Sequence, residues 1–445
     1  MSDEIVTAVE QQGAVEAAER LISQASYLAP AEPNAPFGAG VRHALDEVIA
    51  IAAELGFKTY EDPEGYYGYA ETGSGSELFG IIGHVDVVPA GDPKDWDADP
   101  FKGIVRDNHL YGRGSQDDKG PSMAALFAVK ALENRGYHFN KRIRFIFGTD
   151  EENLWRGIAK YNEKEESVTM GFAPDAEFPL IYAEKGLQDS YLVGPGYDDL
   201  NLNLTNPFNA VPDKAPYNGP RLDEVKEALD AHHFEYQPTD DGIMVKGKAV
   251  HAMQAPKGTN ALLRLAIALD DVFGGRPLDF IGKLFKEDAT GTNVLGTIED
   301  QESGHLTFNI SSLTINEKET RMQIDMRIPV TVDHAQLMTQ LREAVAPYDL
   351  QEEHFDYLAP LYVPKDSPLV ETLMTVYRDE TGDDSQPEVS GGATYARTMT
   401  NTVAYGAMLP GTPDFMHQVN ENWPLDKMFD AMAIYAEAVR RLCTD

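Results

Sequence analysis

Length, composition and charge limit what this chain can be. It has 445 residues, 42% of them hydrophobic, which is enough to build two or three globular domains with cores of their own. Its 73 acidic and 37 basic residues give a net charge of −36, and this surplus argues against nucleic acid or an anionic membrane as a partner.

The sequence also carries signals about its compartment. The single cysteine, Cys443, cannot form an internal disulfide, so the fold suits a reducing cytosol. Residues 1–23 are acidic and helical in pattern, without the basic and apolar regions of a secretory signal. No apolar run reaches the length needed to span a bilayer. We therefore expect a cytoplasmic protein.

Helices and strands alternate over the first part of the chain. Apolar residues at helical spacing predict a helix over 40–55, and a second helix is expected over 122–134, where Pro121 stands at the start. Short apolar, β-branched and aromatic runs predict strands at 66–69, 78–82, 104–111 (with a turn at Asp107-Asn108) and 143–147. Alternation of this kind predicts an α/β domain whose chemistry lies at the carboxyl ends of the strands.

The pattern changes beyond residue 186. Segment 201–220 is rich in Asn and Pro and is predicted to be irregular loop. Predicted helices and strands then follow without regular alternation, at 222–232, 242–250, 261–273 (capped by Gly258-Thr259-Asn260), 305–313, 321–328 and 333–346. This is α+β material, and we expect it to form a separate domain.

The last part of the chain again carries single helices and strands. The patterns predict a helix from Ser367 to about Glu380, a glycine turn over Ser390–Arg397, a strand at 402–408 and an amphipathic helix over 425–442.

Acids and histidines follow several of the predicted strands. His84 and Asp86 stand two residues apart after the strand that begins at Leu78, so in extended chain they face the same side. An imidazole beside a carboxylate suits a metal ligand and the group that orients it. Taken alone, these residues fit equally well a strand end with solvated carboxylates and a hydrogen-bonded histidine.

A larger set of residues favours metal chemistry. A two-metal hydrolase needs about five His, Asp or Glu ligands, one acid shared between the ions, and a free carboxylate as base. Adjacent Glu151 and Glu152 cannot point the same way in extended chain, so one can bind metal while the other faces the water. The candidate ligands are His84, Asp117, Glu152, Asp175 and His417, with Glu151 left over.

Seven motifs together resemble one enzyme family. They are, in chain order, HVDVVP, GRGSQDDKGP, TDEE, FAPDAEFPL, GKAVHAMQAPKGTNA, SGGATYAR and MHQVNE. A chain with these motifs is similar to the di-zinc metallopeptidase clan of aminoacylases, glutamate carboxypeptidases and dipeptidases, and most similar to the PepV-type dipeptidases. The resemblance covers the chain from about residue 80 to its end. It implies a catalytic α/β domain, with a mixed sheet and flanking helices, over 1–185 and 361–445, interrupted by an α+β lid domain over 186–360.

The resemblance also implies a role for each site residue. One Zn²⁺ would be held by His84 and Asp175, and the other by Glu152 and His417, with Asp117 between the ions. The remaining roles are Glu151 as general base, Asp86 as partner of His84, His251 as donor to the oxyanion, Arg327 as anchor for the substrate carboxylate, and a cis peptide bond between Asp117 and Asp118. Co²⁺ or Mn²⁺ could replace Zn²⁺.

The expected activity is hydrolysis of dipeptides with a free amino terminus. Two alternatives stay open: hydrolysis of N-acyl amino acids by the same chemistry, and a binding protein without catalysis. The resemblance further implies an enlarged lid that replaces the partner subunit of dimeric relatives, so a monomer is expected. No nucleic acid and no membrane is expected as a partner.

Overall fold

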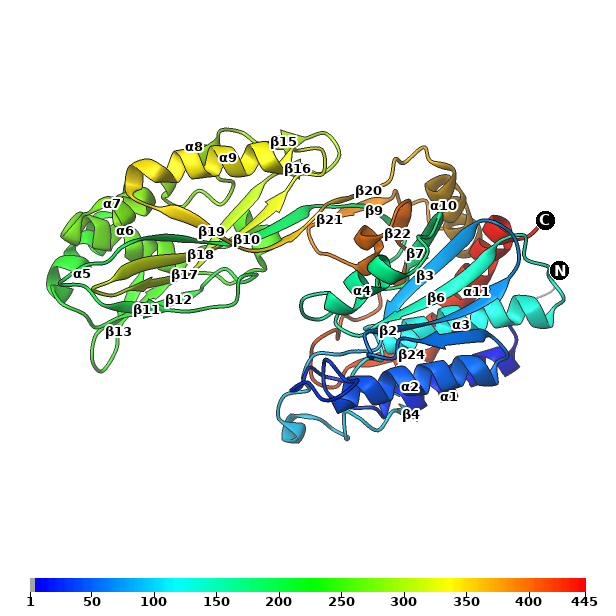
Figure 1. The fold of residues 1–445 in the computed structure, drawn as a ribbon. Coiled ribbons are helices and arrows are strands. Elements are labelled where there is room, and N and C mark those ends of the chain that lie inside the picture. The colour runs from blue at the N-terminus through cyan, green and yellow to red at the C-terminus, as the bar shows by residue number, and fades with distance from the viewer. Residues whose placement is uncertain (1–4) are drawn as a thin grey trace. The chain divides into compact units, whose positions relative to one another are not determined.

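The computed structural model describes residues 5–445, and the chain divides into two compact units (Figure 1). Unit 1 holds the chain up to Tyr182, together with Tyr362–Glu388 and Ala393–Asp445. Unit 2 holds Ala183–Leu361 and Val389–Gly392. Within the helical pattern predicted over 1–23, the structure has a helix from Ala8 to Ile22. Residues 1–4 of that pattern lie outside the described part of the chain.

Unit 1 contains a mixed sheet and the helices that cover it. Its helices are α1 (Ala8–Ile22), α2 (Ala39–Glu54), α3 (Lys119–Asn134), α4 (Arg156–Lys164), α10 (Pro368–Thr381) and α11 (Leu425–Cys443). The strands associated with it are β1 (Lys58–Glu61), β2 (Tyr67–Gly73), β3 (Leu78–His84), β4 (Ile104–Arg106), β5 (His109–Tyr111), β6 (Arg142–Gly148), β7 (Met170–Ala173), β8 (Ala176–Glu177), β9 (Ile181–Glu184), β20 (Leu361–Tyr362), β21 (Glu388–Ser390), β22 (Thr402–Ala404), β23 (Ala407–Met408) and β24 (Asn422–Pro424).

The main sheet has nine strands, in the order β1-β2-β6-β3-β7-β22-β9-β20 with β21 beside β9. The central strands β6, β3, β7 and β22 run parallel, whereas β1, β2 and β9 are antiparallel to their neighbours. All residues of β3 are buried, which explains its continuous apolar run. Because the central strands are parallel, the carboxyl ends of β3, β6 and β7 meet at one edge of the sheet.

Helix α3 lies in the interior of unit 1. It packs against β3 and is flanked by α1 and α11 (Figure 1). Its buried residues include nearly every position from Lys119 to Leu132, so its apolar character extends around the whole helix. The helix begins at Lys119 rather than after Pro121, and the proline occupies the first turn, where a missing N–H costs no helix hydrogen bond.

Unit 2 is built on a five-stranded antiparallel sheet in the order β11-β17-β18-β10-β19. Its strands are β10 (Gly186–Pro195), β11 (Leu202–Leu204), β12 (Lys214–Tyr217), β13 (Tyr236–Pro238), β14 (Ile243–Lys246), β15 (Glu299–Asp300), β16 (Gly304–His305), β17 (Thr307–Ile315), β18 (Glu319–Ile328) and β19 (Gln351–Leu358). Its helices are α5 (Leu222–Ala231), α6 (Ala261–Phe273), α7 (Arg276–Asp279), α8 (Thr292–Leu295) and α9 (His334–Val345). Leu192, Ile324 and Leu265 belong to one apolar core between this sheet and its helices.

The prediction for segment 201–220 is wrong in part, because the segment contains strands β11 and β12. Asn203 pairs with Thr314 of β17, and Ala215 pairs with Val245 of β14. Both strands are short and lie at sheet edges, where Asn and Pro are tolerated. The strand predicted at 402–408 is likewise interrupted, since β22 and β23 are separated at Gly406, which has a φ of 68°.

Within residues 5–445, no helix combines the length and the apolar character that crossing a membrane requires.

Candidate metal centre

The five predicted metal ligands all come from unit 1. His84 ends β3, Glu152 follows β6, and Asp175 lies between β7 and β8. The other two, Asp117 and His417, lie in the loops that precede α3 and β24. Three neighbouring parallel strands and two loops therefore carry the set.

These side chains form two groups that share one acid. In group A, Nε2 of His84 lies 3.0 Å from Oδ1 of Asp117 and 3.7 Å from Oδ2 of Asp175. In group B, Nε2 of His417 lies 2.9 Å from Oδ2 of Asp117 and 3.0 Å from Oε2 of Glu152. Asp117 thus offers a different oxygen to each group. Within each group the ligand atoms lie within 4.8 Å of one another, close enough for one ion.

The tautomer of His84 suits a metal ligand. Its Nδ1 lies 2.9 Å from the main-chain carbonyl of Asp86. Because a carbonyl can only accept, Nδ1 carries a proton, which leaves Nε2, the nitrogen that faces group A, as the one that would bind an ion. The main-chain N–H of His84 donates to Oδ2 of Asp118 at 3.1 Å, which also accepts from the Ser122 hydroxyl. The peptide bond between Asp117 and Asp118 is cis, as the resemblance implied.

The carboxylate of Asp86 holds the loop that follows β6. It accepts the main-chain N–H groups of Glu151 at 3.0 Å and Glu152 at 3.1 Å, while its Oδ1 is 3.5 Å from Nδ1 of His84. Asp86 therefore orients His84 through its carbonyl and both glutamates through its side chain. The indole of Trp155 adds a hydrogen bond to the carbonyl of Glu151.

The electrostatics of the centre favour a cation. Burial raises the pKa of Glu151 well above its usual value, and the nearby charge of Asp175 raises it further. Burial and the charge of Asp117 raise the pKa of Glu152 to about 7. Hydrogen bonds to Asp117 and Glu152 raise the pKa of His417 to about 11, so an imidazolium balances the acids. A divalent ion would supply more positive charge at this place than the imidazolium does. The donor set of carboxylate oxygens and imidazole nitrogens therefore fits the metals that the resemblance implies.

His251, in unit 2, is arranged as a hydrogen-bond donor. It precedes a short 3-10 helix, Ala252–Lys257, and its Nδ1 accepts the N–H of Met253 at 3.2 Å. Burial and the charge of Arg327 lower the pKa of His251, so the neutral ring carries its proton on Nε2.

Arg327, also in unit 2, is held rigidly. Its Nε and Nη2 donate to the two oxygens of Asp325 at 2.9 and 2.7 Å, and its Nη1 donates to the carbonyl of Gly391 at 2.9 Å. The side chain is buried, with 3% of its surface exposed. Three of its five N–H donors are occupied, so one N–H on each terminal nitrogen is left for a ligand.

Two further residues join the loops of the centre, and sequence reasoning gave them no role. Gln116 precedes Asp117, and Glu421 follows His417 by four positions. Both stand inside motifs that carry the resemblance, but Gln116 is not a ligand type and Glu421 does not follow a predicted strand, so pattern alone did not single them out.

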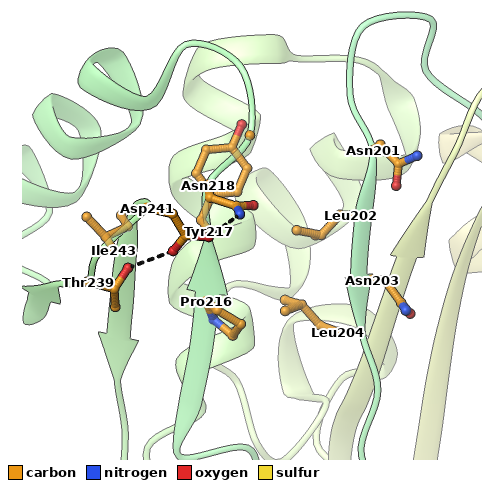
Figure 2. Close-up of a pocket in the computed structure, with 11 residues that line it drawn as sticks. Asn201, Leu202, Asn203, Leu204, Pro216, Tyr217, Asn218, Thr239, Asp241 and Ile243 are labelled. Carbon is orange, nitrogen blue, oxygen red and sulfur yellow. Dashed lines mark hydrogen bonds between the residues drawn. The ribbon is translucent and has the colours of Figure 1, made fainter.

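Unit 2 also contains a pocket, which is shown in Figure 2. It has a volume of about 360 Å³ and lies between β11, β12 and β14. Asp241, the charged residue in the lining, already accepts hydrogen bonds from the side chains of Asn218 and Thr239. The pocket contains none of the predicted site residues and offers no set of metal ligands.

An α/β unit with two ligand groups that share one acid is typical of two-metal hydrolases. The comparisons agree with this class. A model of peptidase family M20/M25/M40 matches residues 80–441, so the chain belongs to this family of metal-dependent peptidases and is an enzyme.

Relatives that match over most of their length are named as dipeptidases. A Staphylococcus saprophyticus protein named "Putative dipeptidase" is 35% identical over 435 residues, with 92% of each chain covered. A Staphylococcus aureus protein of the same name is 36% identical over 442 residues, with 94% of each chain covered. The solved structure of the dipeptidase Dug1p from Saccharomyces cerevisiae matches with a TM-score of 0.61 and 14% identity over 99% of both chains, which shows a shared fold.

Proposed function

We propose that this enzyme hydrolyses dipeptides with a free amino terminus and that it uses two Zn²⁺ ions, for which Co²⁺ or Mn²⁺ can substitute. The observation that carries the proposal is the placement of Asp117, which turns one oxygen to group A and the other to group B. The full-length relatives named as dipeptidases support the substrate class. We further propose that the enzyme acts as a monomer in the cytoplasm.

The proposed reaction assigns the residues of unit 1 as follows. His84 and Asp175 would hold one ion, and Glu152 and His417 the other, with Asp117 as the shared ligand. When bound, the ions would polarise the scissile carbonyl and make a water more acidic. Glu151, whose carboxylate belongs to neither group, would take a proton from the attacking water and pass it to the leaving amine.

The proposed roles of the two unit 2 residues follow from their donors. The Nε2–H of His251 would donate to the oxyanion that develops on the carbonyl oxygen. The two remaining N–H groups of Arg327 would pair with the carboxylate of the substrate. On this proposal the substrate carboxylate lies one residue from the scissile bond, so a dipeptide is the expected substrate.

A substrate panel tests the proposal. The Zn²⁺-loaded protein should cleave dipeptides with free termini and should act poorly on tripeptides and on N-acetyl amino acids, as measured by release of free amino acids. Efficient cleavage of N-acetyl amino acids without cleavage of dipeptides would move the activity to the N-acyl amino acid class. Absence of any hydrolysis, with metal bound, would favour a binding protein.

Metal removal provides the second arm. Exhaustive chelation should abolish the hydrolysis and lower the melting temperature, because ions that bind only the folded state stabilise it by mass action. Zn²⁺, Co²⁺ or Mn²⁺ should restore both. Full activity of the chelated protein would contradict the two-ion proposal.

A further inference from the structure

His417 differs from His84 and Asp175 in how it is held. His84 and Asp175 adjoin strands of the central sheet, which fixes their backbone. His417 lies instead in the irregular segment 409–421, has a left-handed backbone with a φ of 61°, and leaves 53% of its side chain exposed. Its position therefore depends on whatever holds this segment.

Strand pairing brings segment 409–421 beside the loop that carries Asp117. In the antiparallel pair of β5 and β24, Tyr111 faces Asn422. One residue further, the N–H of Gly112 donates to the carbonyl of Glu421 at 3.0 Å. Beyond this pair the two segments, after β5 and before β24, have no regular structure, and side-chain contacts hold them together.

The carboxylate of Glu421 holds the Asp117 loop. It accepts from Nη1 of Arg113 at 2.6 Å and from the main-chain N–H groups of Gly114 at 3.1 Å and Gln116 at 2.9 Å. Glu421 is 1% exposed, so these contacts are shielded from water. A carboxylate that accepts from three buried donors, one of them a guanidinium, forms a strong link.

The side chain of Gln116 holds the His417 segment in return. Its Nε2 donates to the carbonyls of Pro413 at 2.9 Å and Asn422 at 2.8 Å, and its Oε1 accepts the N–H of Phe415 at 2.9 Å. Both amide hydrogens and the amide oxygen are therefore used. These three hydrogen bonds hold the backbone at positions before and after His417.

We propose that Gln116 and Glu421 are positioning residues that hold His417 against Asp117 and thereby set the affinity of group B for its ion. The inference rests on the proposed two-ion function. Neither side chain belongs to a ligand group, and group A contains no residue of segment 409–421. Loss of the Gln116 side-chain contacts should therefore weaken the ion in group B and leave the ion in group A in place. Loss of the Glu421 contacts, which hold the loop of the shared Asp117, should weaken the ion in group B more than the ion in group A.

Stepwise metal titration of the full chain tests this. Gln116→Met keeps the length of the side chain and removes its hydrogen bonds. Titration of Zn²⁺ or Co²⁺ into the chelated variant should show one site weakened about 10–100-fold, the usual effect of losing such a supporting contact, and the other within about twofold of wild type. The weakened site should be the one that His417→Ala removes. Activity should return when the metal concentration is raised.

A second variant and a control guard against loss of folding. Glu421→Gln keeps the shape of the side chain but removes its charge, and it should weaken the same site to a smaller extent. Gln188→Met removes another buried amide, which is 0% exposed and lies in unit 2. It should lower the melting temperature without changing either metal affinity.

Two outcomes would overturn the inference: equal weakening of both sites in Gln116→Met, or unchanged affinity of both sites with a lowered melting temperature. Uptake of fewer than two ions by the wild-type protein is a distinguishable result, because it would contradict the proposed two-ion function itself and the inference with it.

Discussion

Glu151 and Glu152 are neighbours in the sequence, yet only Glu152 belongs to a ligand group. Asp86 accepts both of their main-chain N–H groups, so the backbone of the pair is fixed while the side chains diverge. Burial is the main cause of the raised pKa at both positions. Position, rather than acidity, therefore separates the two roles that we propose.

Matched substitutions at this pair test the assignment. Glu151→Gln should keep both ions and lose about 10²–10⁴-fold in kcat, the usual contribution of a general base. Glu152→Gln should lower the metal content from two ions to one, because it replaces a charged ligand. Elemental analysis and initial rates on a dipeptide provide the readouts. If both variants retain the same metal content, the roles are assigned wrongly.

Arg327 provides a prediction about substrate choice. Arg327→Ala should lower kcat/KM for a dipeptide with a free carboxylate about 10–100-fold, mainly through KM, because a charged hydrogen bond contributes about 1.5–3 kcal/mol. The C-terminal amide of the same dipeptide should be affected little. The variant also leaves Asp325 buried without its partner, but this loss of stability affects both substrates equally and cancels in their ratio. An unchanged ratio would exclude carboxylate recognition by Arg327.

At the scale of helices and strands, the predictions are confirmed where the local sequence contains a turn or a capping residue. The turn predicted at Asp107-Asn108 separates β4 from β5, and both residues adopt positive φ, at 50° and 62°. Asn260 caps α6 as predicted, with its side chain accepting the N–H of Leu263. Strands β11 and β12 escaped prediction because their pairing partners, β17 and β14, are distant in sequence.

Helix α6 contains an acid that should make stability depend on pH. Asp270 is 6% exposed, and burial, followed by the hydrogen bond to Asp279, raises its pKa to about 7. Asp271 and Asp279 also face it with negative charge, and Lys283 with positive charge. Because the folded state holds a proton that the unfolded chain releases near pH 4, stability is lost as pH rises toward and through 7.

Asp270→Asn should remove this dependence. Relative to wild type, the unfolding free energy of the variant should rise by about 2–3 kcal/mol between pH 5 and pH 8, because the folded-state pKa of Asp270 is about 7 and each pH unit between 5 and 7 contributes about 1.4 kcal/mol. Urea denaturation at the two pH values provides the measurement. Asp240→Asn, at an exposed position of unit 2 away from Asp270, is the control and should leave the pH dependence as it is in wild type. A parallel loss of stability in Asp270→Asn and wild type would contradict the assignment.

At the scale of the whole molecule, the proposed monomer is the feature most open to test. The lid predicted over 186–360 is expected to replace the partner subunit of dimeric relatives. Light scattering should therefore give a mass near 49.1 kDa for the metal-loaded enzyme. Mixing inactive His251→Ala and Glu151→Gln variants should restore no activity. A stable dimer whose two variants complement each other would show that His251 acts in the partner's site.

The sequence by itself determined the family, the mixed α/β architecture and the identity of the candidate ligands. These are local signals, because a buried parallel strand such as β3 has a continuous apolar run and the acids and histidines follow strand ends. Only the tertiary structure decided which oxygen of Asp117 faces which histidine, and that Gln116 and Glu421 tie together two loops about 300 residues apart. Contacts of this kind join residues that are remote in sequence, and hydrophobic periodicity carries no information about such pairings.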